Sequence, residues 1–149
     1  MESFENKIAV VTGGGTGMGR ELVCQLIAAG AHVAMCDVSQ ENMDDTLRLA
    51  NAGEQRLTHH LCDVSEEAQM LAFRNEVMAQ HDTAHINLLF NNAGIGGGGS
   101  FVKGDRDEWE RTYAVCWDGV YFGCRAFLDA IVASDEGHIV NTSSVNGFW

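Results

Sequence analysis

A glycine-rich stretch near the N-terminus has the residue types and spacing of a phosphate-binding turn. It reads TGGGTGMGR from Thr12 to Arg20 and directly follows the apolar run KIAVVT. Glycines let the backbone turn tightly and approach a phosphate, and the N-terminus of a following helix supplies N–H groups and partial positive charge. Arg20 follows Gly19, so the Gly-Lys-Ser/Thr ending of a P-loop is absent. The stretch predicts a pyrophosphate site; the alternative is a glycine turn without a ligand.

An acidic residue stands about 20 residues beyond these glycines, the usual place of a ribose-binding carboxylate. Asp37 ends the apolar run HVAMCD, and the surrounding CDVSQ contains no Lys or Arg. Such a carboxylate accepts hydrogen bonds from the 2′-OH of NAD and repels the 2′-phosphate of NADP. Thr16 in the turn is not basic either. NAD is therefore the predicted cofactor, and the alternative is that Asp37 only caps the loop that follows.

Five apolar runs are predicted as the strands that position these residues. They span 7–12, 32–37, 56–62, 86–90 and 137–142. The runs are continuously apolar rather than alternating, which is typical of parallel strands buried on both faces. Four helix-like stretches lie between them, so the sequence predicts an α/β fold with helices on both faces of a parallel sheet.

The predicted helices have recognisable ends. The first helix is closed by Gly30, the second is capped by Ser39 and runs to about Ala52, and Ser65 is predicted to cap the third. Asp105 with Glu108 resembles a capping box, which opens a long helix to about residue 132. An apolar stripe follows this helix: Trp109, Tyr113, Cys116, Val120, Cys124, Phe127 and Ile131.

The composition excludes several classes of protein. With 9 Lys and Arg against 21 Asp and Glu, the formal net charge of −12 argues against nucleic acid or an anionic membrane as partner. No apolar run approaches the roughly 20 residues of a membrane span, and no signal peptide is visible in MESFENKIAV. The five Cys form no Cys-x-x-Cys, and the His residues lack converging ligands. These features predict a reduced, cytoplasmic, single-domain protein without disulfide or metal site.

Three further motifs and the long helix fall in register with this pattern. Cys62-Asp63-Val64 ends the third strand, NNAG (residues 91–94) ends the fourth, and IVNTSS (139–144) forms the fifth. Together with the glycine spacing, they make the chain resemble the short-chain dehydrogenase/reductase family over essentially its whole length. A methyltransferase, the other α/β candidate with a glycine turn, has no reason to carry NNAG or IVNTSS.

The resemblance implies a role for each matched residue. Those at the cofactor would be Gly13, Thr16, Gly17, Met18 and Gly19 at the pyrophosphate, Asp37 at the ribose, Asp63 and Val64 at the adenine, and Asn91, Ala93 and Gly94 beside the ribose and nicotinamide. Ser144 matches the family's catalytic Ser, whose hydroxyl hydrogen-bonds the oxygen of a small-molecule alcohol or ketone. Ser143 would then be an ordinary polar residue at the strand end. No metal is implied.

The family's hydride transfer also uses a Tyr and a Lys four residues later, which lowers the pKa of the Tyr. Here Tyr113 and Tyr121 are followed at that distance by Trp117 and Arg125, and the matching pair would lie beyond Trp149. The 149 residues are therefore expected to be an N-terminal portion, inactive by itself. The alternatives are a non-catalytic dinucleotide-binding or interaction module derived from the family, or a fragment that does not fold alone.

The implied fold is a Rossmann-like doubly wound sheet with five strands in the order 3-2-1-4-5, incomplete on its C-terminal side. Strand five would become an exposed edge, which invites association. The family usually dimerises through the long helix, so a homo-oligomer through residues 105–132 is expected. Cys116 replaces the family's usual Asn in Val-Asn-x-x-Gly, which places the family's proton relay in question. The residues indicate neither the substrate nor the direction of the reaction.

Overall fold

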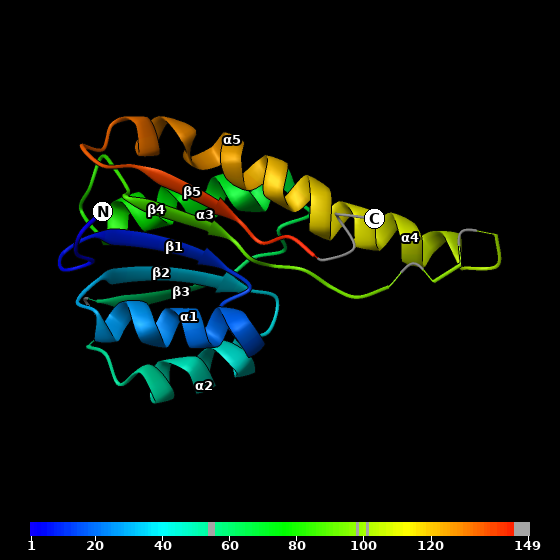
Figure 1. Ribbon diagram of the computed structural model, residues 1–149, viewed down its shortest axis with the longest axis horizontal. Coiled ribbons are helices and arrows are strands. Elements are labelled where there is room, and N and C mark those ends of the chain that lie inside the picture. Colours follow the sequence, from blue (N-terminus) through cyan, green and yellow to red (C-terminus); the bar gives the residue numbers. More distant parts are fainter. Residues whose placement is uncertain (54–55, 98, 101, 145–149) are drawn as a thin grey trace.

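The computed structural model describes residues 1–53, 56–97, 99–100 and 102–144, and its centre is a five-stranded parallel sheet (Figure 1). The strands are ordered β3-β2-β1-β4-β5, which confirms the predicted order. They are β1 (Ile8–Thr12), β2 (His32–Asp37), β3 (Leu57–Leu61), β4 (Leu88–Asn91) and β5 (His138–Asn141). Because all the pairings are parallel, the carboxyl ends of the strands meet at one end of the sheet.

Helices cover both faces of the sheet (Figure 1). One face carries α1 (Gly17–Ala28) and α2 (Gln40–Ala50), and the other carries α3 (Glu67–Gln80) and α5 (Gly119–Val132). A short helix, α4 (Arg106–Tyr113), and a π-helical segment, η1 (Ala114–Asp118), precede α5. Among the described residues, no helix combines the length and the apolar character needed to cross a membrane.

The core consists of two apolar layers, one on each side of the sheet. Val11, Val33 and Met35 belong to the layer under α1 and α2, whereas Val10 and Phe127 belong to the layer under α3 and α5. All five side chains are fully buried. Burial on both faces explains why β1 and β2 are continuously apolar in sequence.

Two of the predicted helix ends need correction. The Ser39 side chain accepts from the N–H of Asn42, as expected of a cap, but α2 ends at Ala50 because Asn51 takes a left-handed φ of 47°. Ser65 does not cap α3, which begins at Glu67. The hydroxyl and the N–H of Ser65 instead donate to Asp63 Oδ1, so a local turn uses the groups that a cap would need.

The predicted long helix is helical throughout, but it is not uniform. Asp105 caps its start by accepting from the N–H of Asp107. Residues 114–118 are π-helical, an irregularity that the apolar periodicity did not predict. Phe127 is buried, whereas Tyr113 is 56% exposed, so only the C-terminal part of the predicted apolar stripe faces the core.

Candidate cofactor site

The glycine turn between β1 and α1 is shaped by contacts that only glycine permits. Gly13 has a φ of 68° and Gly17 a φ of 55°, both in the left-handed region. A Cβ on Gly13 would lie 2.8 Å from the Cα of Ala93. A Cβ on Gly19 would overlap the carbonyl oxygen of Gly13. The turn therefore brings its backbone close both to itself and to the segment after β4.

Helix α1 starts at this turn without a side-chain cap. Its N-cap residue, Thr16, is extended and makes no side-chain capping hydrogen bond. The first N–H groups of any α-helix lack partners within the helix, and they carry partial positive charge. At α1 this end of the helix faces the cavity described below, which suits it to hold an anionic group.

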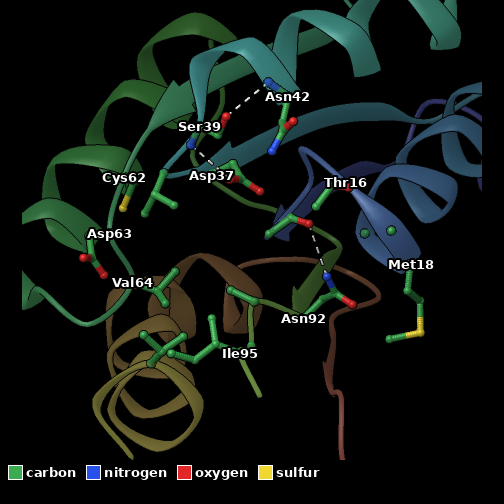
Figure 2. A pocket seen from close by; sticks show the side chains of 17 residues that line it. Thr16, Met18, Asp37, Ser39, Asn42, Cys62, Asp63, Val64, Asn92 and Ile95 are labelled. Carbon is green, nitrogen blue, oxygen red and sulfur yellow. Dashed lines mark hydrogen bonds between the residues drawn. The ribbon is translucent and has the colours of Figure 1, made fainter. Parts of the chain in front are cut away.

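The Asp37 carboxylate is fixed at the end of β2 by two backbone donors. The N–H of Gly15 donates to Oδ2 at 3.0 Å, and the N–H of Ser39 donates to Oδ1 at 3.0 Å. Figure 2 shows the carboxylate beside Ser39 and Asn42 at the wall of the cavity. Each oxygen keeps further acceptor capacity, because a carboxylate accepts about four hydrogen bonds.

Thr12 joins the glycine turn to the segment after β4. Its Oγ1 accepts from the N–H groups of Asn92 and Ala93, each at 3.0 Å. The Asn92 side-chain amide in turn donates to the carbonyl oxygen of Thr12 at 3.1 Å. The ends of β1 and β4 are thus tied together over 80 residues of sequence.

A cavity of about 500 Å³ opens at the carboxyl ends of the strands (Figure 2). It is lined by Gly13, Thr16, Gly17, Met18, Gly19, Asp37, Val38, Ser39, Asn42, Cys62, Asp63, Val64, Asn92, Ala93, Gly94, Ile95 and Val115. This lining brings together all the predicted cofactor-binding residues except Asn91. Two carboxylates and no Lys or Arg belong to it.

Asn91 lies below the cavity rather than in its wall. It is 2% exposed, and its Nδ2 donates to Asn141 Oδ1 at 2.8 Å and to Cys124 Sγ at 3.4 Å. The following residue, Asn92, lines the cavity instead. The NNAG motif locates the segment, but β4 ends at Asn91, whose amide is held against β5, and the cavity is lined by Asn92 in the loop that follows.

Several lining residues were not predicted to contact the cofactor. Ser39 and Asn42 lie just after Asp37, and Cys62 directly precedes the predicted Asp63. Their position next to predicted site residues in the sequence could have identified them. Ile95 and Val115 gave none, because their apolar side chains are equally consistent with ordinary packing.

Two neighbouring thiols lie at the carboxyl ends of β2 and β3, and one of them, Cys62, lines the cavity. Cys36 and Cys62 are both buried, and the hydrogen bond between them raises the pKa of the Cys36 thiol and lowers that of Cys62. Burial raises the pKa of Cys36 further. All five cysteines are free thiols. Within the described ranges, no group of three or more His, Cys, Asp or Glu is placed to hold a metal ion.

Ser144, the predicted catalytic Ser, lines a second cavity of about 420 Å³. The two cavities share the wall formed by residues 92–95. Cys116 also lines the second cavity, and its thiol donates to the carbonyl oxygen of Ile95 at 3.5 Å. A hydroxyl at Ser144 is thus brought next to the segment where the cofactor's reactive ring was predicted.

Comparisons with known proteins agree with this geometry. The model of the short chain dehydrogenase family matches residues 7–149. The SadH protein of Mycobacterium tuberculosis, described as an oxidoreductase, is 40% identical over 147 residues, which are 99% of this chain and 52% of that protein. The chain therefore spans about half the length of this relative.

Solved structures of short-chain dehydrogenases also match nearly the whole chain. A short chain dehydrogenase/reductase from Burkholderia phymatum, in complex with NAD, has a TM-score of 0.92 at 31% identity and covers all of this chain and 53% of its own. A metagenomic short-chain oxidoreductase, in complex with NADP, has a TM-score of 0.87 at 33% identity, over 97% of this chain and 66% of its own. The two complexes hold different dinucleotides, so the likeness does not select between NAD and NADP.

Proposed function

Because the chain belongs to the short-chain dehydrogenase family, whose members bind nicotinamide dinucleotides, we propose that it binds NAD in the first cavity in preference to NADP. One observation carries the preference: the fixed Asp37 carboxylate lies in a wall without Lys or Arg. There it accepts from a ribose 2′-OH and repels a 2′-phosphate.

We assign the other lining residues to the remaining parts of the dinucleotide. The glycine turn and the start of α1 hold the pyrophosphate, while Asp63 and Val64 lie at the adenine. Ala93 and Gly94 border the nicotinamide end, next to the second cavity. Asn91 supports the nicotinamide end of the cavity from below, because its amide donates to Asn141 at the end of β5.

The test is a fluorescence titration with NADH and NADPH. Asp37→Asn removes the charge and keeps the shape, so the dissociation constant for NADH should rise about tenfold or more, and the discrimination against NADPH should shrink. The matched control is Asp44→Asn on α2, which removes the same charge outside the cavity wall and should leave both constants unchanged. Equal affinity of the unaltered protein for NADH and NADPH contradicts the proposed preference.

For catalysis we propose the family's hydride transfer with a small-molecule alcohol or ketone, with Ser144 hydrogen-bonding the substrate oxygen. The bound dinucleotide supplies or accepts the hydride. The 149 residues contain no Tyr followed by Lys at the fourth residue, so we propose that this chain alone binds NADH without turnover. That same observation favours the second candidate, a non-catalytic dinucleotide-binding module.

A turnover assay tests the expected inactivity of this chain. NADH formation from NAD and a panel of alcohols by the 149-residue chain would show that a proton acceptor other than the family's Tyr is present. Binding without turnover is the expected result. We also propose a cytoplasmic protein, supported by its five free thiols, and a homo-oligomer formed through residues 105–132.

A further inference from the structure

Thr46, on α2, directs a buried hydroxyl at the glycine turn. Its side chain is fully buried, and Oγ1 lies 3.0 Å from the carbonyl oxygen of Gly14 and 3.1 Å from that of Gly15. The carbonyl oxygen of Asn42 is also 3.1 Å away. A hydroxyl has one hydrogen to donate, so it bonds one of these oxygens at a time and can accept from another donor.

Arg20, on α1, supplies that donor and contacts the same turn. Its Nε donates to Thr46 Oγ1 at 3.1 Å and to the carbonyl oxygen of Gly15 at 3.0 Å. Its Nη2 also donates to the Gly15 oxygen, at 2.6 Å, and to the Asn42 oxygen at 3.2 Å. Asp45 lies 3.8 Å from the same guanidinium. Arg20 and Thr46 thus form a clamp on the Gly15 carbonyl, and neither lines the cavity.

The opposite side of Gly15 faces the carboxylate assigned to the ribose. The N–H of Gly15 donates to Asp37 Oδ2 at 3.0 Å. A Cβ on Gly15 would lie only 2.8 Å from the Asp37 Cγ, so the turn and the carboxylate are in close contact. Any shift of the Gly15 backbone therefore has to move or release Asp37.

We infer that Arg20 and Thr46 are positioning residues for cofactor discrimination: they hold Gly15 so that its N–H fixes Asp37 in the orientation that accepts from the ribose 2′-OH. This inference rests on the proposed NAD preference and adds two residues that touch no cofactor. A merely structural role predicts a general loss of stability and an equal loss of affinity for both dinucleotides. Positioning predicts a loss that is specific to NADH and acts through Asp37.

The test is a double-mutant cycle on dissociation constants for NADH and NADPH. Thr46→Val should raise the constant for NADH about 3- to 10-fold, the factor that one ordinary hydrogen bond corresponds to, with a smaller change for NADPH. Thr46→Ser keeps the hydroxyl and should restore the NADH affinity. In an Asp37→Ala background, Thr46→Val should have no further effect on NADH. Arg20→Met, which keeps the length and removes the donors, should reproduce the result if Thr46→Val does not fold.

The outcomes separate this inference from the proposal beneath it. An additive effect of Thr46→Val and Asp37→Ala, or equal losses for NADH and NADPH, overturns the positioning role and leaves the NAD preference standing. If the unaltered protein binds no NADH, the proposed function fails, and the inference fails with it. Thermal melting of each variant without ligand identifies losses of affinity that only reflect unfolding.

Discussion

At Gly123 helix α5 comes so close to β4 that no side chain fits between them. A Cβ there would overlap Oδ1 of Asn91, a buried oxygen without a hydrogen-bond partner among the described residues. The other end of the Asn91 amide donates to Asn141 on β5. The close contact between Gly123 and the Asn91 amide therefore holds in place the side-chain bond that adds to the backbone pairing of β4 with β5.

Gly123→Ala should force Asn91 out of place and break its bond to Asn141. Overpacking of a close contact typically costs about 1–3 kcal/mol of the free energy of unfolding, which urea denaturation measures. Gly53→Ala is the control, because a Cβ there meets nothing within 4 Å, and it should change stability by less than about 0.5 kcal/mol. Equal costs for the two substitutions would show that the Gly123 contact relaxes freely.

At the scale of elements, a chain of hydrogen bonds joins β3 to α3 and to the loop after it. His60 Nδ1 lies 2.6 Å from Glu76 Oε2, and Thr58 Oγ1 lies 3.1 Å from His81 Nε2. Burial lowers the pKa of His60, although Glu76 partly opposes this effect. Burial also lowers the pKa of His81, with contributions from the nearby His32 and His60.

These shifts predict a loss of stability in mild acid. A histidine whose pKa is lower in the folded state binds fewer protons there than in the unfolded chain, where its pKa is about 6.5. The free energy of unfolding should therefore keep its full value above that pH and decline as the pH falls through it. The measurement is the melting temperature between about pH 7.5 and pH 5.5, a window around that same value.

Two variants test whether this chain of hydrogen bonds causes the pH dependence of the melting temperature. His81→Gln keeps a polar side chain without the titration, so its melting temperature should depend less on pH. His59→Gln is the control, since His59 lies on the opposite face of β3 from His60. If both variants keep the full pH dependence of the unaltered protein, other groups cause it.

At the scale of the whole molecule, several exposed aromatic side chains gather along α4, η1 and α5. The rings of Tyr113 and Trp117 are stacked with their centroids 6.2 Å apart, and Trp117 is 64% exposed. Tyr121 is 52% exposed on the same helical stretch, with the Arg125 guanidinium over its ring. Exposed apolar patches of this kind mark association sites.

Self-association through this surface should be visible by sedimentation velocity. Increasing protein concentration should shift the chain from monomer toward dimer, and Trp117→Gln should weaken the dimer by about tenfold or more, since buried aromatic residues dominate interface energies. Leu49→Gln on α2 is the matched control, equally exposed at 64% but remote from α5. A concentration-independent monomer would contradict the proposed oligomer.

The sequence by itself determined the α/β class, the five strands to within two residues at each end, and the glycine turn with Asp37. These features are local: strands buried on both faces read as continuous apolar runs, and a turn with positive φ requires glycine at fixed positions. The strand order and the catalytic assignment of Ser144 followed instead from family resemblance, because residue periodicity says nothing about which strands pair.

Only the tertiary structure decided which side chains meet. It placed Asn92 rather than Asn91 in the cavity wall, and it turned Ser65 toward Asp63 instead of toward α3. It also brought Thr46 of α2 against Gly15, 31 residues away. The physical reason is the same in each case: the direction of a side chain at the end of an element depends on pleat, register and packing against other elements, which residue types and their local spacing do not encode.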